Sequence, residues 1–559
     1  MTTSLVIAPL LVALATAILT LLTRPSDRLQ RAVSLAGGVG YFVVVAALFR
    51  LVVLPFGSAT TLVYHVGDWQ APFGIVLVAD PLSAFMLGIA AIVSICALTY
   101  SVFYVDAFGQ RLSYHPIYHF MMVGVSGAFL TGDVFNLFVW FEVMLMSSYI
   151  LVLFYSGPEH TRAAITYVVM NLIGGSVMLV AIGGIYATTG TLNMADLARR
   201  LAHPATYDVH LLPVLGLAGV LFSVFALKAG LVPFQFWVPS AYRAAPAPVT
   251  TMLAGVVKKV GVYAIIRLYF TVFSAATLPA GLGLPGFAGN SMLAFFGPVL
   301  FVMATASIFF GGVGAVGRDD LDGVLAYSSI SQVGFIVLPL AVAATAGSPA
   351  LAALGVTAAL VYSVNHGLSK GMLFLASGTI QEAVGTDDFD ALGGVAGRSP
   401  VLAGAFLVGA LSLIGVPPLT GFFGKLLVFQ TAADATATTV AGGVLALAVA
   451  LAGAILTIAY YTRAWNAVFW GPTTERVDAA IPDGWTRPAA GAMGIDAVAD
   501  GGRRRALAGE VIVVVVLALA IVGLGVGFDG LFAAANAAAH AALDTGRYVS
   551  AVAPAGGPA

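Results

Sequence analysis

The chain has 559 residues, of which 60% are hydrophobic and 9% charged, and its mean hydropathy is +1.00. Soluble domains carry about 25% charged residues, so these values exclude a water-soluble globular protein of this length. The formal net charge of -1 provides no basic face for nucleic acid, and the single cysteine, Cys96, excludes an internal disulfide and a cysteine-ligated iron–sulfur cluster. We expect an integral membrane protein with no cofactor and no nucleic-acid partner.

Apolar runs of about 20 residues, each long enough to cross about 30 Å of hydrocarbon, recur along the chain. The first run lacks the basic segment of a cleaved signal peptide, so we interpret it as a span. The longest connection, 467–508, is rich in Gly, Pro, Asp and Arg and predicts a loop. The pattern predicts an all-α fold of about fourteen transmembrane helices, near 3–23, 32–54, 82–104, 116–131, 134–155, 164–187, 211–232, 248–272, 293–313, 323–343, 351–376, 401–430, 440–466 and 509–527.

Arginine placement predicts the orientation of these spans. With the N-terminus outside, most loop arginines, such as Arg111, Arg243 and Arg398, lie on the inner side, whereas Arg199 and Arg200 lie outside. An excess of basic residues in inner loops is the normal bias of membrane proteins. We therefore predict a multi-pass protein of the plasma membrane with its N-terminus outside.

Two predicted helices are interrupted by proline. The seventh breaks at Pro233 in LKAGLVPFQFW, and the twelfth breaks at Pro417 and Pro418 in IGVPPLTGFFGK. They lie five helices apart, so units of five helices would have opposite orientations, which is the inverted-repeat pattern of many transporters. We predict helices 1–3 in residues 1–110, one five-helix repeat in 111–273, a second in 290–470, and a loop, helix 14 and a tail in 471–559.

All five lysines of the chain fall inside predicted spans, whereas the loops use only arginine. A charge at the middle of a bilayer costs about 2.5–3.5 kcal/mol, so five ammonium groups and Glu142 would together cost roughly 15–20 kcal/mol if unpaired. This exceeds the typical stability of a domain, about 5–15 kcal/mol. One deep glutamate cannot balance five ammonium groups. Because burial disfavours the charged form of an amine, some of these lysines are expected to gain and lose protons.

Each buried charge also has a simpler interpretation. Glu142, about 12 Å deep in its span, needs a partner from another helix and could form a purely structural ion pair. Lys228 lies just before the Pro233 break and Lys425 just after the second break. Either lysine could extend its ammonium to the membrane surface, although the backbone groups freed by proline favour a hydrated cavity at both places.

Adjacent lysines at 258 and 259 point about 100° apart on a helix. Lys259 belongs to a polar stripe at spacing four that includes Thr251, Gly255, Tyr263 and Arg267, so we place it in the interior. For Lys258 we expect a position facing a neighbouring subunit or the membrane surface.

His366 and Lys370 lie four residues apart and share a helix face with Tyr362. Histidine titrates near neutral pH and suits a proton relay, although a hydrogen-bonded core histidine is the alternative.

At these residues the chain resembles the antiporter-like membrane subunits of respiratory complex I, membrane-bound hydrogenases and Mrp-type cation/proton antiporters. The similarity covers about residues 80–470 and includes FNLFVWFEVM, LKAGLVPFQFWVPSAYRAAPAPVT, KKVGVYAIIR, LAYSSISQVGF and NHGLSKGMLFLASG. It is strongest to the D-type subunits of Mrp antiporters. The chain length leaves no room for the long lateral helix of the complex I L-type subunit.

The resemblance implies a proton relay on five residues, with further antiporter subunits as partners and a monovalent cation, Na⁺, as the second substrate. The relay residues that it implies are Glu142, Lys228, Lys259, His366 and Lys425, supported by Lys370, Tyr263, Pro233, Pro417 and Pro418. The sequence does not show whether the metal cation itself passes through this chain. The chain departs from many relatives at Gln235 and Gln332, where histidine is common, and at Asp322-Gly323, where a basic pair is common.

The hypothesis is that opening of a Glu142–Lys228 pair releases a proton, which moves to Lys259 and past His366 to Lys425. One alternative is a proton-pumping subunit of a complex I or hydrogenase-like redox complex. Another is a scaffold subunit inactive in transport, in which the buried lysines would tolerate replacement. No motif of an intramembrane enzyme stands out from the sequence.

Overall fold

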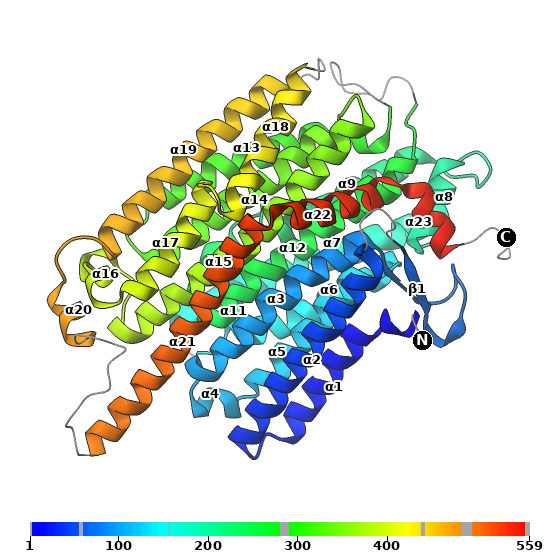
Figure 1. Ribbon diagram of the computed structural model, residues 1–559. Coiled ribbons are helices and arrows are strands. Elements are labelled where there is room, and N and C mark those ends of the chain that lie inside the picture. Colours follow the sequence, from blue (N-terminus) through cyan, green and yellow to red (C-terminus); the bar gives the residue numbers. More distant parts are fainter. Residues whose placement is uncertain are drawn as a thin grey trace.

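The computed structural model describes residues 3–54, 60–155, 157–279, 290–437, 442–481 and 495–553. Long helices lie side by side along one common direction (Figure 1). The first part of the chain contains α1 (Ala8–Leu22), α2 (Asp27–Val53), α3 (Pro81–Tyr104), α4 (Ala107–Arg111), α5 (Tyr114–Leu130), α6 (Val134–Val152), α7 (Pro158–Thr189), α8 (Met194–Ala202), α9 (Leu211–Ala229), α10 (Trp237–Ala244) and α11 (Ala247–Met252).

The remaining described elements are two π-helical segments, η3 (Leu253–Val257) and η4 (Ile266–Val272), and the helices that surround and follow them. These helices are α12 (Lys258–Ile265), α13 (Met292–Val316), α14 (Leu321–Ala344), α15 (Pro349–Val384), α16 (Val395–Arg398), α17 (Pro400–Ile414), α18 (Thr420–Ala437), α19 (Gly443–Val468), α20 (Glu475–Ala480), α21 (Ile495–Val526), α22 (Phe528–Leu543) and α23 (Thr545–Val552). Short 3₁₀ segments cover Thr3–Leu5, Val66–Asp68, Phe273–Ala275 and Phe389–Ala391.

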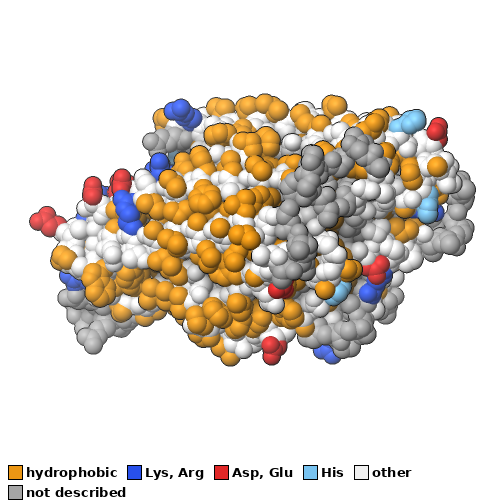
Figure 2. Space-filling model, turned by 90° about the horizontal axis from the view of Figure 1, so that it is seen from above, with side chains coloured by type: hydrophobic (Ala, Val, Ile, Leu, Met, Phe, Trp, Pro, Cys, Tyr) orange, Lys and Arg blue, Asp and Glu red, His pale blue; other side chains and the backbone are white. Residues whose placement is uncertain are grey.

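The prediction of a helical membrane protein is confirmed. Within the described residues, 11 helices are long and apolar enough to cross a membrane, and α1 and α17 are shorter apolar helices. Each predicted span overlaps helical structure among the described residues, and the span 401–430 is divided between α17 and α18. Figure 2 shows apolar side chains over a broad band of one face, with the visible charged side chains mainly toward its borders. Such a band suits contact with acyl chains.

One end of the bundle carries α4, α16 and α20, and we call it the α4 end. The opposite end, which we call the hairpin end, carries α8, α23 and two antiparallel strands, β1 (Leu62–His65) and β2 (Val76–Ala79) (Figure 1). We did not predict these strands from the sequence. Each has only four residues, too few for the alternation of apolar and polar side chains to stand out.

Capping side chains fix where several of the helices begin. Asp80, Asp133 and Asp320 accept hydrogen bonds from backbone N–H groups in the first turns of α3, α6 and α14. An aspartate at this position satisfies amide donors that have no partner within the helix. These caps place three acidic residues just outside apolar helices, where sequence hydropathy marks the edge of a span.

The C-terminal region differs from its predicted form. We expected a loop up to residue 508 and a tail after 527, but α21 begins at Ile495, and α22 and α23 follow it. Helix α22 is rich in alanine, which has the highest helix propensity, and it buries Leu531, Ala535 and Ala538. The loop prediction was wrong at this point because Gly, Asp and Arg in 496–505 lowered the local hydropathy without ending the helix.

Candidate functional site: a buried row of lysines

The segment Ala247–Ala275 lies at the centre of the bundle, and its most apolar stretch is completely buried. It contains α12, which carries Lys258 and Lys259 between the π-helical segments η3 and η4. π-Helical turns widen a helix locally and are frequent at functional sites. Because other helices surround this segment on all sides, neither lysine can face lipid.

All five lysines are buried, with exposed fractions of at most 3%. Among the residues that the structure describes, no carboxylate forms an ion pair with any of them. Their partners in the described part of the chain are uncharged oxygen and nitrogen atoms and aromatic rings. Hydrogen bonds of this kind serve a neutral amine as well as an ammonium, so this environment does not fix the protonation state of the row.

Lys228 is at the last turn of α9, and its Nζ donates to Oδ1 of Asn171 on α7 at 3.1 Å. The ring of Phe141 lies 5.8 Å from the same ammonium. Glu142 is half-buried on α6, and its Oε1 has no hydrogen-bond partner among the described atoms. A Cβ atom on Gly175 of α7 would lie 2.6 Å from that oxygen, so the carboxyl lies against α7. Lys228 therefore contacts an amide in this structure, with Glu142 nearby but separate.

Lys259 and His366 form the centre of the row. Nζ of Lys259 lies 2.6 Å from Nδ1 of His366 on α15 and donates to the carbonyl oxygen of Ala254 at 2.6 Å. The other ring nitrogen of His366, Nε2, lies 3.3 Å from the hydroxyl of Ser329 on α14. One imidazole thus joins an amine on one side to a hydroxyl on the other, an arrangement in which a proton can enter and leave through different ring atoms.

Lys258 does not lie where we expected it. It is fully buried, its Nζ donates to the carbonyl oxygen of Ser329 at 3.4 Å, and it lies 5.8 Å from the ring of Tyr242 on α10. The expectation of an outward orientation was wrong, because the helix that carries Lys258 has no outward face.

Lys370 lies one turn after His366 on α15. Its Nζ donates to the carbonyl oxygen of Leu325 at 2.9 Å, to the hydroxyl of Tyr461 at 3.0 Å, and to the hydroxyl of Ser328. Ser328 and Ser329 of the LAYSSIS segment thus contact Lys370 and His366, which agrees with the prediction that these two residues share a helix face.

Lys425 lies at the second break. Its Nζ donates to the carbonyl oxygen of Ile414 at 3.1 Å and lies 4.9 Å from the ring of Phe335. Ile414 ends α17, so this carbonyl has no partner further along its own helix. The backbone freed by Pro417 and Pro418 therefore supplies the acceptor for the lysine.

Gln332 is buried on α14, one turn after Ser329, which contacts His366. Its amide donates to the hydroxyls of Tyr460 at 2.6 Å and Thr457 at 3.2 Å, and it accepts a hydrogen bond from the hydroxyl of Tyr362. The side chain of Gln332 is an amide that acts as donor and acceptor at once. It can order a chain of hydroxyl groups but cannot itself carry a proton in the neutral pH range.

The predicted supporting residue Tyr263 belongs to a different network. Its hydroxyl donates to the carbonyl oxygen of Phe129 at 2.8 Å and accepts from Arg267, which forms two hydrogen bonds of 2.7 Å with the Asp80 carboxylate. No hydrogen bond joins Tyr263 to Lys259 among the described residues. The polar stripe of this helix therefore has an ion pair at its hairpin end and amines in the middle.

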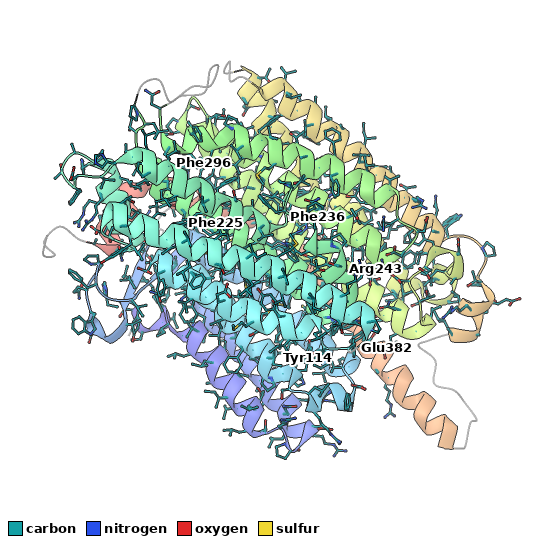
Figure 3. All side chains as sticks on the ribbon, turned by 180° about the vertical axis from the view of Figure 1, so that it is seen from behind. Tyr114, Phe225, Phe236, Arg243, Phe296 and Glu382 are labelled. Carbon is teal, nitrogen blue, oxygen red and sulfur yellow. The ribbon has the colours of Figure 1, made fainter. Side chains whose placement is uncertain are left out.

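At the α4 end, Asp322 accepts a hydrogen bond of 2.6 Å from Ser377, and its backbone N–H donates to Asp387 at 3.1 Å. Asp322 thus connects the start of α14 to Ser377 on α15 and to Asp387, which follows α15. Figure 3 places Arg243 and Glu382 toward this end, Phe296 toward the hairpin end, and Phe225 and Phe236 between them. The latter two flank the break between α9 and α10.

Sequence reasoning missed several partners of the lysines: Asn171, Ser328, Ser329, Tyr242 and Tyr461. Of these partners, only Asn171 could have been found from hydropathy, because it is a polar amide in an otherwise apolar span. The others are hydroxyl-bearing residues, which are common in membrane helices and carry no comparable signal.

Comparisons with known proteins identify the family and the fold. Residues 131–451 match the family described as NADH:quinone oxidoreductase/Mrp antiporter, TM. The D subunit of the Na(+)/H(+) antiporter of Alkalihalophilus pseudofirmus is 36% identical over 84% of this chain and 87% of that protein. The N subunit of the NADH-quinone oxidoreductase of Desulforudis audaxviator is 33% identical over 94% of this chain and 95% of that protein. One protein in the Mrp complex from Dietzia sp. DQ12-45-1b superposes with a TM-score of 0.80 at 28% identity, covering 99% of both chains.

Proposed function

Because this chain belongs to the NADH:quinone oxidoreductase/Mrp antiporter family of membrane subunits, we propose that it carries protons in a multisubunit monovalent cation/proton antiporter. The observation that supports this most directly is the row of five buried lysines with no carboxylate in contact among the described residues. Structural charges inside a membrane are normally paired. Amines kept apart from acids are instead suited to exchange protons with their neighbours.

The relay that we propose runs through Glu142, Lys228, Lys259, His366 and Lys425. When Glu142 moves to Lys228, the ion pair holds the lysine protonated. When the two separate, as in the arrangement with Asn171, Lys228 loses its counterion and the proton leaves toward Lys259 and His366. From there it passes Lys370 and the Gln332 network to Lys425. The movement of internal water completes the steps that no direct contact spans.

We assign Na⁺ as the exchanged cation because the name of the Alkalihalophilus relative specifies it. The partners are the other subunits of the antiporter, and the membrane is the plasma membrane. A unit charge that crosses a membrane potential of 100 mV releases about 2.3 kcal/mol. The membrane potential can therefore drive the exchange without a chemical step on a cofactor. We further propose fourteen crossings with two inverted five-helix repeats, residues 111–273 and 290–470, related through the breaks at Pro233 and Pro417-Pro418.

The test is cation/proton exchange in everted membrane vesicles after expression of the whole gene cluster. Lys228→Ala should abolish exchange while the complex still assembles. Arg162→Ala, which removes an exposed positive charge, is the matched control and should exchange normally. Undiminished exchange in the Lys228→Ala variant would refute the relay.

The second candidate is a proton-pumping subunit of a redox-driven complex, favoured by the similarity to the Desulforudis protein along nearly the whole chain. The two candidates predict different partners. Purification of the complex from its native membrane should yield small hydrophobic antiporter subunits in the first case, and iron–sulfur or quinone-binding subunits in the second.

A further inference from the structure

We propose that Lys258 is an additional proton-carrying residue, which connects Lys228 at the end of α9 to the Lys259–His366 centre. The inference rests on the proposed relay and supplies a connection that the relay lacks, since no described contact joins Lys228 directly to Lys259 or His366.

On the side of Lys228, the long side chain of Lys258 lies against the break that follows α9. Gly230 follows Lys228 by two residues and has a left-handed backbone, with φ +69°. A Cβ atom placed there would lie 2.9 Å from Cε and 3.2 Å from Nζ of Lys258. The absence of a side chain at Gly230 therefore lets the Lys258 amine reach the end of the helix that carries Lys228.

On the other side, Lys258 is two contacts away from the centre. Its Nζ donates to the carbonyl oxygen of Ser329, and the hydroxyl of the same serine lies 3.3 Å from Nε2 of His366. His366 then contacts Lys259 through its other ring nitrogen. Lys258 and Lys259 thus reach the same imidazole by different routes, although they are neighbours on one helix.

The second break offers an internal comparison. There Gly415, also left-handed at φ +101°, lies under the side chain of Lys425, with 3.1 Å between a Cβ atom placed on Gly415 and the Lys425 Cδ. Each interrupted helix therefore has a glycine covered by a buried lysine. Lys425, a predicted relay residue, belongs to the interrupted helix itself, whereas Lys258 covers Gly230 from the following helix, α12.

The surroundings of Lys258 contain other basic groups but no acid in contact among the described residues. The titratable groups that face it are Tyr242 on α10, Lys259 on its own helix, and His366 and Lys370 on α15. In the part of the chain that the structure describes, the carbonyl of Ser329 is its one hydrogen-bond acceptor, whereas an ammonium has three N–H donors. A fixed positive charge here would be poorly compensated, which favours a group that gives up its proton in part of the cycle.

Three substitutions separate the possible roles of Lys258 in the assembled complex. Lys258→Met keeps the length of the side chain but cannot hold a proton. Lys258→Arg keeps a positive charge but cannot release its proton in a protein. Lys258→His can both bind and release a proton, and its pKa lies several pH units below that of lysine.

We expect the Met and Arg variants to lose exchange by about 100-fold in vesicles, as for the loss of a proton-transfer group, and the His variant to retain exchange with a pH profile displaced to lower pH. Normal exchange in Lys258→Met, normal exchange in Lys258→Arg, or a His variant that is inactive or has an unchanged profile would each overturn the inference. Should a variant fail to assemble, Ser329→Ala tests the same connection with a smaller change. Exchange slowed about tenfold would support it, and an unchanged rate would overturn it.

Lys228→Ala and Lys425→Ala, measured in the same preparations, separate this inference from the relay itself. If both abolish exchange while Lys258→Met does not, the role of Lys258 is wrong and the relay stands. If neither of these two substitutions affects exchange, the proposed relay itself is wrong, whatever the result for Lys258→Met.

Discussion

Nζ of Lys259 and Nδ1 of His366 lie 2.6 Å apart at the centre of the bundle, although 107 residues separate them in the chain. When Nδ1 accepts from the amine, the imidazole proton is on Nε2 and faces Ser329; when the neutral amine accepts, Nδ1 carries the proton. This contact places the one histidine of the row where the two halves of the predicted repeat meet.

His366→Ala should reduce exchange by about 100-fold at every pH, because the amine of Lys259 and the hydroxyl of Ser329 then have no titratable group between them. The measurement is the rate of proton release from vesicles across a pH series. His540→Ala, which removes an exposed histidine, is the control and should behave as the wild type. A His366→Ala variant with wild-type rates would mean that protons bypass this residue.

Asn171→Asp should slow exchange by about tenfold, because a carboxylate 3.1 Å from Lys228 would hold the lysine protonated permanently. The change adds one acid without altering the shape of the side chain. Adding Glu142→Gln also removes the relay carboxylate, so the double variant should exchange more slowly than Asn171→Asp alone. Equal rates in the single and double variants would show that Glu142 and Lys228 are not coupled.

The Asp80–Arg267 ion pair should contribute to stability more than any exposed pair. Both side chains are buried, and removal of one partner leaves an uncompensated charge, which costs about 3–5 kcal/mol. Asp80→Asn retains the helix cap but removes the charge, so we expect a large fall in the melting temperature of the purified complex.

The control for this measurement is Arg398→Ala, which breaks the partly exposed pair with Asp478 and should change the melting temperature little. Replacing both members of the buried pair, in Asp80→Asn with Arg267→Met, should destabilise less than the two single changes added together. Strict additivity would argue against a direct interaction in the folded protein.

The proposed orientation can be tested with introduced cysteines, since the single native thiol, Cys96, is buried and can be replaced by serine. Arg111 and Asp208 are both exposed and lie at the α4 end and near the hairpin end, respectively. With the N-terminus outside, Asp208→Cys should react with a membrane-impermeant maleimide in intact cells. Arg111→Cys should react only after permeabilisation. The opposite labelling pattern would invert the topology.

The amino-acid sequence determined the membrane class, the approximate positions of the apolar helices, the two proline breaks and the location of the lysines inside apolar helices. These features follow from local composition, because a run of apolar residues enters hydrocarbon whatever the rest of the chain does. The same local rules did not place the beginning of α21, where polar residues extend the helix on the N-terminal side of its apolar part.

The tertiary structure alone decided which groups meet the buried amines and which way Lys258 points. Its partner Ser329 is 71 residues away in the chain, and the partner of Lys228 is 57 residues away. Periodicity along one helix separates an inner from an outer face only when the helix has an outer face. The helix that carries Lys258 and Lys259 is enclosed on every side, so both lysines are interior, and their different contacts depend on neighbouring helices that no local pattern specifies.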